Sequence, residues 1–332
     1  MSEATSLPPH RAPNPRRLGV SPDFLIIGAM KSGTTSIHHL LDADPRIFMP
    51  QGEVQFFSVD DIEQNPVFFQ YLGDRWTRPS FEADFEELDR WHTGAYAGMQ
   101  PGQLLGEDAP SYLPSRRAID RLARFLPGAK LIVTLRDPVD RLESQYWHWV
   151  RTFRAHFDLE ETLQYQPGNL LQRSYYEEQL RHVLDRFPRE QVLVLLFESL
   201  IRDEAGSTAR LYDFLGMAPP EGQAAPPPHR NAGRYPRFPR LAGWRNRAFR
   251  RRYGRKYLQR VPWLPEPAPT PWPSRLGMAL AQRLNRNVAR RPAPMRPETR
   301  AFLAALLRER NAGLGDLLGE DLARYWPTFS TP

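Results

Sequence analysis

The chain of 332 residues contains no cysteine, and this absence excludes several kinds of chemistry. Without thiols there is no disulfide framework, no thiolate nucleophile and no zinc site built on cysteine. The sequence also lacks any run approaching the roughly 20 consecutive apolar residues that span a membrane, so no transmembrane helix is predicted. Residues 1–20 are rich in proline, arginine and serine and contain no apolar signal core. We therefore expect a disordered leader there and a cytoplasmic location.

Acidic residues are missing from one long segment. Residues 222–265 contain eleven Arg, one Lys and no Asp or Glu, whereas the whole chain carries a net charge of +7. Such a block favours a polyanionic ligand, acidic lipid headgroups or nucleic acid, and it is equally compatible with a solvated basic face. The overlapping residues 219–273 contain 13 of the 34 prolines. We therefore expect an irregular excursion rich in proline and arginine at this point of the chain.

Short apolar runs alternate with helical segments along most of the remaining sequence, which is typical of an α/β fold with a parallel sheet. We predict one domain over residues 21–332, in which helices flank a central parallel β-sheet. The predicted strands cover residues 24–29, 130–135 and 191–197. The predicted helices cover residues 34–43, 115–126, 139–152, 171–187 and 204–215, and C-terminal helices follow at 274–288, 297–311 and 314–326.

The first chemical signal is the strand, tight loop and helix start over residues 23–36. An apolar run, residues 24–27, leads into a turn of small residues, and a helix-like segment starts at Thr34. Loop amides and the positive end of a helix dipole point at one spot in such a turn, and Lys31 adds a full charge. This predicts an anion-binding loop formed by consecutive residues, namely Lys31, Ser32, Gly33, Thr34 and Thr35.

The loop differs from the phosphate loop of kinases in one respect that matters. That motif has a glycine, four further residues and then Gly-Lys-Ser/Thr. Here Gly28 and four residues lead to Gly33, but Thr34 follows it, and the lysine stands earlier, at position 31. A small-molecule kinase that uses Asp137 to bind Mg²⁺ therefore remains an alternative but is disfavoured. A third interpretation is a binding module whose arginine block contacts a polyanion.

The second signal begins where the predicted strand 130–135 ends. Arg136 would lie at the carboxyl edge of the sheet, where open α/β sheets place ligands, and Pro138 suits the first turn of a helix. Along that helix, Arg141, Ser144 and His148 would share roughly one face. A guanidinium and a hydroxyl that converge in this way can hold a phosphate.

Together, these two strings resemble the sulfotransferases that use 3′-phosphoadenosine 5′-phosphosulfate (PAPS), and most closely the heparan-sulfate-type enzymes and their bacterial relatives. The resemblance covers roughly residues 22–236 and, more weakly, the last fifty. It implies a P-loop-like domain that transfers a sulfuryl group to a hydroxyl or amine of a carbohydrate or other small metabolite. It also implies that loop amides hold the 5′-phosphate, that Lys31 stabilises the leaving oxygen, and that Arg136 and Ser144 bind the 3′-phosphate. No metal is expected, because lysine, arginine and amides can meet the charge of the donor.

Further motifs support the resemblance. Glu53, followed by Phe56 and Phe57, resembles the family's Glu-x-x-Phe-Phe element, in which the glutamate takes the proton of the acceptor; His148 is the rival base. Gly52 stands where the family often has a lysine, and Asp108 stands where eukaryotic relatives have a lysine near the sulfuryl group. The segment 229–236 resembles the loop that closes over the 3′-phosphate, which assigns this contact to Arg230, Gly233 and Arg234. The arginine block is compatible with an anionic acceptor, and nucleic acid is not an expected partner.

Overall fold

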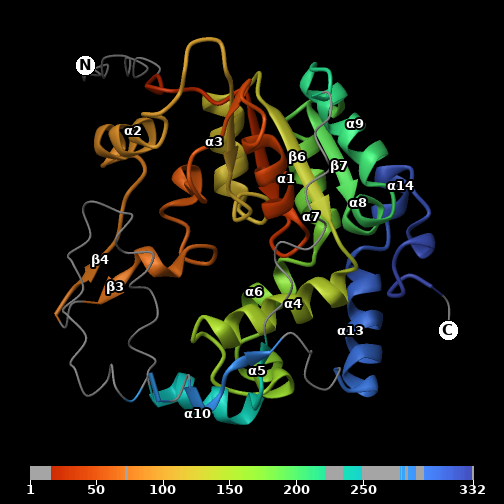
Figure 1. The fold of residues 1–332 in the computed structure, drawn as a ribbon. Coiled ribbons are helices and arrows are strands. Elements are labelled where there is room, and N and C mark those ends of the chain that lie inside the picture. The colour runs from red at the N-terminus through yellow and green to blue at the C-terminus, as the bar shows by residue number, and fades with distance from the viewer. Residues whose placement is uncertain are drawn as a thin grey trace, which may run out of the picture.

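The computed structural model describes residues 16–71, 74–220, 235–248, 277, 279–280, 283–288 and 295–330, and the fold below refers to these residues (Figure 1). Its centre is a five-stranded sheet in the order β2-β5-β1-β6-β7, in which every neighbouring pair runs parallel. The strands are β1 (Phe24–Gly28), β2 (Ile47–Phe48), β5 (Leu104–Asp108), β6 (Lys130–Leu135) and β7 (Val192–Leu196). The predicted parallel α/β fold is therefore confirmed.

Helices cover both faces of this sheet, because the side chains of its strands alternate between two cores. Leu25 and Ile27 of β1 lie in a cluster with apolar side chains of α3 (Arg116–Phe125) and α7 (Tyr176–Leu184). Phe24 and Ile26 point the other way, toward α1 (Thr34–Asp42) and α9 (Glu204–Leu215). All five residues of β1 are buried, as expected of a central parallel strand with both faces covered.

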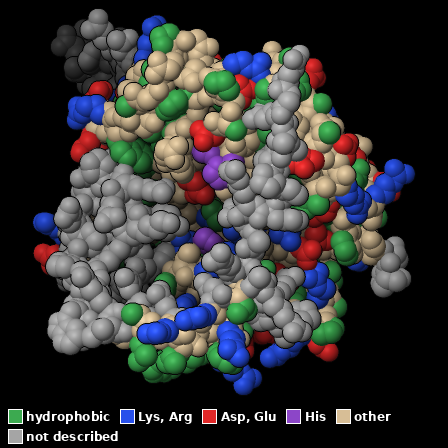
Figure 2. Space-filling view, in the orientation of Figure 1, with side chains coloured by type: hydrophobic (Ala, Val, Ile, Leu, Met, Phe, Trp, Pro, Cys, Tyr) green, Lys and Arg blue, Asp and Glu red, His purple; other side chains and the backbone are tan. Residues whose placement is uncertain are grey.

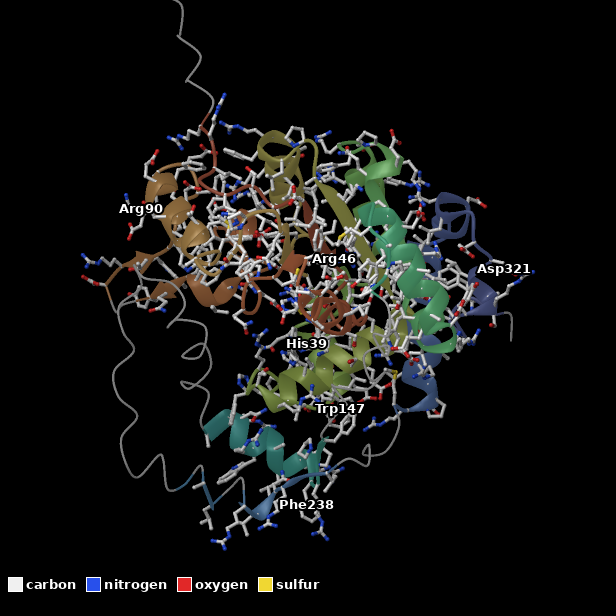
Figure 3. All side chains as sticks on the ribbon, turned by 45° about the horizontal axis from the view of Figure 1, so that its top comes forward. His39, Arg46, Arg90, Trp147, Phe238 and Asp321 are labelled. Carbon is white, nitrogen blue, oxygen red and sulfur yellow. The ribbon has the colours of Figure 1, made fainter. Side chains whose placement is uncertain are left out.

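A third apolar cluster lies beside the sheet and is built around α4 (Pro138–Arg151). Figure 1 shows α4 together with α5 (Leu159–Tyr165), α10 (Pro239–Ala248) and α13 (Pro297–Arg310) below the sheet. Asn246 of α10 donates hydrogen bonds to the carbonyls of Val150 and Ala155, which ties α10 to the end of α4. Trp147 and Phe238, labelled in Figure 3, line a separate cavity of ≈ 450 Å³ between α4, α5 and α10.

The remaining elements are short. The helices are α2 (Phe85–Gly94), α6 (Gly168–Gln172), α8 (Phe197–Arg202) and α14 (Leu314–Leu318), and the 3₁₀ turns are η1 (Phe56–Ser58), η2 (Pro66–Phe68), η3 (Arg189–Gln191) and η5 (Leu322–Arg324). Two antiparallel pairs also form, β3 (Gln70–Tyr71) with β4 (Trp76–Thr77) and β8 (Tyr235–Pro236) with β9 (Asn287–Val288). No helix among the described residues is long and apolar enough to span a membrane. The cytoplasmic location and the single domain stay predictions.

Several predicted elements need correction. The helix expected over 171–187 is two helices, α6 and α7, and Ser174 in the turn between them accepts a hydrogen bond from Arg141. The described part of 274–288 ends in strand β9 instead of a helix, and the helix expected over 314–326 ends at Leu318 because Gly319 adopts a left-handed conformation. Strand β5 was not predicted, since its last two residues are acidic and its apolar run is short.

Two segments predicted to be irregular contain ordered residues. Gly19 donates its backbone amide to the carboxylate of Asp89, and Val20 is buried, so residues 16–20 belong with the folded part of the chain instead of the leader. Within the excursion expected over 219–273, residues 239–248 form helix α10. Arg245 of this helix is buried and donates to the carbonyl of Val150, so not every arginine of the basic block forms a solvated face.

Candidate active site

One cavity of ≈ 480 Å³ opens where β1 and β6 end, at the carboxyl edge of the sheet. Figure 2 shows histidine and acidic side chains gathered in the recess at the middle of this face. The cavity brings together most of the residues that the sequence singled out, namely Lys31, Gly33, Thr34, Thr35, Glu53, Arg136, Ser144 and His148. These residues come from segments more than a hundred positions apart, and the fold brings them to one cavity. That they bind phosphate stays a prediction.

The anion-binding loop adopts a conformation that depends on Gly33. Its φ is +97°, and a Cβ atom there would lie 2.8 Å from the ring of Phe197. Lys31 also has a positive φ of 74°, which directs the backbone sharply between strand and helix. No side chain of the described residues caps the start of α1, and the amide of Ser36 donates to the carbonyl of Gly33. The amides of Thr34 and Thr35 at the helix start are the ones that an anion can use.

Lys31 carries the charge of this loop at a half-buried position on the cavity wall. Burial first, and then the charge of Arg151, lowers the pKa of Lys31 to about 8, while Glu53 acts in the opposite direction. The lysine therefore remains mostly protonated at neutral pH, and a bound anion would stabilise its charged form.

Ser32 does not contribute as the sequence predicted. Its side chain is fully buried and does not line the cavity, and its amide donates to the carbonyl of Ala29 across the turn. Lys31 and Thr34, on either side of it in sequence, line the cavity instead.

Arg136 and Ser144 both line the cavity, as expected for a phosphate clamp. The guanidinium of Arg136 lies 4.9 Å from the centre of the Phe197 ring, so the same ring that closes over Gly33 also supports this arginine. Arg141, expected on the same helical face, instead points into the protein. It is fully buried and donates hydrogen bonds to Ser174 and to the carbonyl of Leu170. Its guanidinium therefore holds neighbouring segments together and does not line the cavity.

Asp137 is not placed to bind Mg²⁺. It caps the N-terminus of α4 by accepting from the amides of Val139 and Asp140, at 3.0 and 3.1 Å. It also accepts from the amide and hydroxyl of Thr328, at 2.9 and 2.8 Å. Because both of its oxygens are engaged and it does not line the cavity, the kinase alternative loses its metal ligand.

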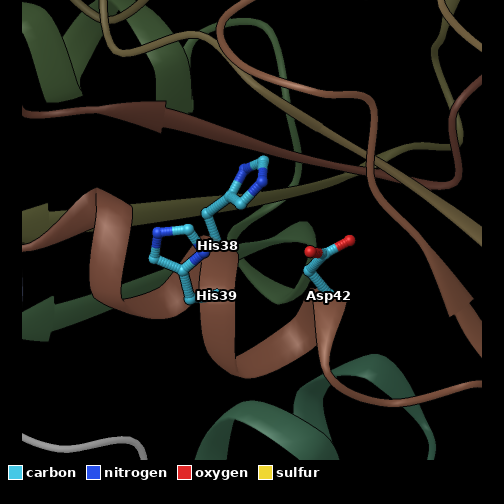
Figure 4. Close-up of side chains that lie close together, drawn as sticks. All are labelled: His38, His39 and Asp42. Carbon is cyan, nitrogen blue, oxygen red and sulfur yellow. The ribbon is translucent and has the colours of Figure 1, made fainter. Parts of the chain in front are cut away.

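Another group of metal-type donors lies on α1, where His38, His39 and Asp42 have donor atoms within 4.8 Å of one another (Figure 4). None of the three lines the cavity, and His38 faces the carboxylate of Asp108 at 3.4 Å. We assign no metal to this group.

Glu53 lies at the cavity wall on a firmly anchored segment. Phe56 and Phe57, just beyond it, are fully buried, and Phe56 stacks on His92 with ring centres 4.5 Å apart. The amide of Phe57 donates to the hydroxyl of Tyr112. Burial first, and then the charge of Asp108, raises the pKa of Glu53. A hydrogen bond from Gln55 at 2.9 Å acts against this rise and orients one carboxylate oxygen.

The rival base, His148, lies in the same cavity but in an unfavourable electrostatic setting. Burial first, and then the positive charge of Lys31 and nearby arginines, lowers the pKa of His148 to about 2. An imidazole that resists protonation this strongly is a poor acceptor for a proton, so the electrostatics favour Glu53 as the base.

The rest of the cavity wall was not predicted. Besides a few apolar residues, it contains amide, aromatic and basic side chains, including Gln64, Asn65, Trp149, Asn169 and Arg173. Arg173 donates to both the side chain and the backbone carbonyl of Gln64 across 109 positions of sequence, a pairing that no local pattern signals. The predicted contacts Arg230, Gly233 and Arg234 lie outside the described residues.

Asp108, which stands where relatives have a lysine, is buried at the end of β5. One of its oxygens lies 3.4 Å from the ring nitrogen Nδ1 of His38, and the other has no hydrogen-bond partner among the described residues. No additional cation therefore comes from this position.

The parallel sheet carries a glycine-dependent loop between β1 and α1, and Arg136 lies at the end of the neighbouring strand β6. This arrangement defines an α/β protein with a P-loop-like fold. The sequence matches the sulfotransferase family over residues 22–221, and the chain belongs to this family.

Curated relatives include the human heparan sulfate glucosamine 3-O-sulfotransferase 3B1, which is 28% identical over 207 residues, covering 59% of this chain and 46% of the relative. The human heparan sulfate glucosamine 3-O-sulfotransferase 6 is 27% identical over 228 residues, and the matched region covers 64% of this chain and 57% of the relative. The chain thus spans about half the length of these relatives. A sulfotransferase structure from Alicyclobacillus acidocaldarius shares the fold, with a TM-score of 0.60, 24% identity and coverage of 92% of this chain and 99% of that one.

Proposed function

We propose that the protein transfers the sulfuryl group of PAPS to a hydroxyl or amine of a carbohydrate or related small acceptor. The observation that carries the proposal is that one cavity holds the anion-binding loop, the Arg136–Ser144 pair and the half-buried carboxylate of Glu53. Family membership supports the same reaction class.

The donor would lie along the carboxyl edge of the sheet. Amides of Gly33, Thr34 and Thr35 at the start of α1 would hold the 5′-phosphate, and Arg136 with Ser144 would hold the 3′-phosphate. The contacts expected from Arg230, Gly233 and Arg234 would complete this site. The donor is a substrate whose charge is met by Lys31, arginines and amides, so no metal enters the proposal.

The chemical step is an in-line displacement at sulfur. Glu53 accepts the proton of the acceptor O–H or N–H, and the freed electron pair forms the new bond to sulfur. The bond between sulfur and the bridging oxygen breaks, and its electron pair leaves with 3′-phosphoadenosine 5′-phosphate (PAP). Lys31 stabilises the charge that gathers on that oxygen, where a preorganised cation is most effective.

The remaining wall of the cavity supports a polyhydroxylated acceptor. Gln64, Asn65 and Asn169 add polar amide side chains to this wall, and the indole of Trp149 provides an apolar face of the kind on which a sugar ring packs. Asn65 and Asn169 are held in place by hydrogen bonds from their amide nitrogens to Ser58 and to the carbonyl of Glu63. Arg173, which is buried and hydrogen-bonded to Gln64, adds positive charge to this wall, which favours an acceptor that carries an acidic group. The names of the relatives point to glucosamine-containing glycans, and we include these among the acceptors to be tested.

The test is a transfer assay with ³⁵S-labelled PAPS and a panel of oligosaccharide acceptors with free hydroxyl or amino groups. We expect label in the acceptor, and we expect transfer to survive an excess of EDTA. A parallel assay with γ-labelled ATP and Mg²⁺ tests the kinase alternative. Transfer from ATP that stops on chelation, without transfer from PAPS, would overturn the proposal.

A further inference from the structure

Among the residues that the structure describes, three that are not glycine have a left-handed backbone, and all three line the active-site cavity. They are Lys31, Gln55 and Phe153, with φ values of 74°, 59° and 67°. Residues with a side chain rarely adopt this conformation, and strained residues of this kind cluster at binding and catalytic sites. Lys31 belongs to the anion-binding loop, and Gln55 donates to Glu53. Phe153 is the one of the three that the proposed reaction does not yet use.

Phe153 lies just past the end of α4, in a loop of residues 152–157 that leads to α5. Ser144, which with Arg136 would hold the 3′-phosphate, precedes the last residue of α4 by seven positions, or about 10 Å along the helix axis. His148 and Trp149 line the cavity between these two points. The ring of Phe153 is therefore well separated from the phosphate clamp, in the part of the cavity that remains for an acceptor.

The backbone on both sides of Phe153 is fixed by hydrogen bonds. The amides of Arg154 and Ala155 both donate to the carbonyl of Trp149, at 2.9 and 3.2 Å. From α10, the fully buried side chain of Asn246 donates to the carbonyl of Ala155 at 2.7 Å and to the end of α4 at 3.0 Å. The left-handed conformation is therefore enforced by contacts around it and does not belong to a free loop.

Helix α10 also contacts the ring itself. The guanidinium of Arg245 lies over the Phe153 ring, 4.4 Å from its centre, and this arginine is only 6% exposed. Arg247 donates to the carbonyl of His156, another residue of the cavity wall, at 2.7 Å. The ring of Phe153 remains half-buried, so part of it is open to a ligand. Two arginines of the basic block thus shape the wall of the cavity.

We propose that Phe153 is an acceptor-binding residue whose ring packs on the apolar face of a pyranose, and that α10 holds it in place for this contact. The inference rests on the proposed sulfuryl transfer and adds a residue that sets acceptor specificity. The C–H groups on one face of a pyranose form a flat apolar surface that an aromatic side chain can cover. Trp149 offers a second aromatic surface on the same wall, which favours a sugar over a flexible aliphatic alcohol.

The experiment measures kcat and KM for a tetrasaccharide of alternating glucuronic acid and N-acetylglucosamine, with KM for PAPS as the internal reference. Phe153→Gly and Phe153→Asn remove the ring but tolerate a positive φ, so the loop can keep its course. We expect both variants to raise KM for the tetrasaccharide at least about fivefold, the size of effect seen when an aromatic contact is truncated at an interface. KM for PAPS should stay near the wild-type value. Phe153→Tyr keeps the ring and should restore KM for the tetrasaccharide.

The matched control is Phe157→Asn. Phe157 belongs to the same loop, and its ring also lies beside an arginine of α10, with Arg247 at 5.3 Å, but it does not line the cavity. We expect its KM values to match the wild type. Asn246→Ala tests the contribution of α10 and should raise KM for the tetrasaccharide although Phe153 is intact. Adding Phe153→Gly to Asn246→Ala should then have a smaller effect than in the wild type, because two changes that act through one contact are not additive.

An unchanged KM for the tetrasaccharide in both variants without the ring, an equal rise in KM for PAPS, or the same defect in Phe157→Asn would overturn the inference. A wild type that sulfates other acceptors but not the tetrasaccharide would also overturn it and leave the proposed function intact. No transfer from PAPS to any acceptor would refute the proposed function itself. Stabilisation by PAP in a thermal melt shows that each variant is folded and retains its donor site. If Asn246→Ala does not fold, the Phe153 variants decide.

Discussion

Replacement of Gly33 by alanine tests how the donor site is built. An alanine at position 33 would have to adopt a left-handed backbone conformation, which costs roughly 1–2 kcal/mol. Its Cβ would also lie 2.8 Å from the Phe197 ring, and such overpacking costs about 1–3 kcal/mol. We expect Gly33→Ala to lower the free energy of unfolding by about 2–5 kcal/mol in a denaturant titration. The matched control is Gly128→Ala, because Gly128 has no atom within 4 Å of its Cβ position and no positive φ.

The same substitution should weaken donor binding through Phe197. If the ring moves away from the new methyl group, Arg136 loses a cation–π contact at 4.9 Å, worth about 0.5–2 kcal/mol. The Kd for PAP, measured by calorimetry, should therefore rise about 2- to 30-fold. A Gly33→Ala protein that matches the Gly128→Ala control in both stability and PAP affinity would refute the argument that Gly33 and Phe197 shape this site.

Four further outcomes are expected. PAP should raise the melting temperature far more than adenosine 5′-phosphate does, and Arg136→Ala should lose this preference through a charge-assisted hydrogen bond worth about 1.5–3 kcal/mol; equal shifts by both nucleotides in the wild type would argue against a 3′-phosphate clamp. Lys31→Ala should reduce kcat more than it weakens PAP binding, and an effect on KM for PAPS alone would make Lys31 a binding residue only. Glu53→Gln should retain PAP affinity and lose roughly 10²–10⁴-fold in rate, whereas full activity together with an inactive His148→Ala protein would move the base to His148. On the alkaline side, kcat/KM should fall as pH rises through about 8, because Lys31 loses its proton there, and this limb should be absent in Lys31→Ala.

Much of the donor site could be predicted from sequence because its geometry is local. An apolar strand, a turn with a glycine and a helix start follow one another within residues 23–36, and the chain cannot form them without pointing amides at one place. Arg136 likewise follows directly from the end of β6, and a parallel sheet brings the carboxyl ends of its strands to one edge.

What only the tertiary structure decided is which charged side chains are free for chemistry. Asp137 and Arg141 belong to the same string as Arg136, but both are hydrogen-bonded to distant parts of the chain. Asp137 accepts from Thr328, 191 positions away, and Arg141 donates to Ser174, 33 positions away. Arg173 lines the cavity because a distant segment, which carries Gln64, accepts its hydrogen bonds there. Local sequence determines where a backbone turns and where a strand ends. The burial and partners that fix the charge and reactivity of a side chain come from segments far away in the chain, and these are known only once the chain has folded.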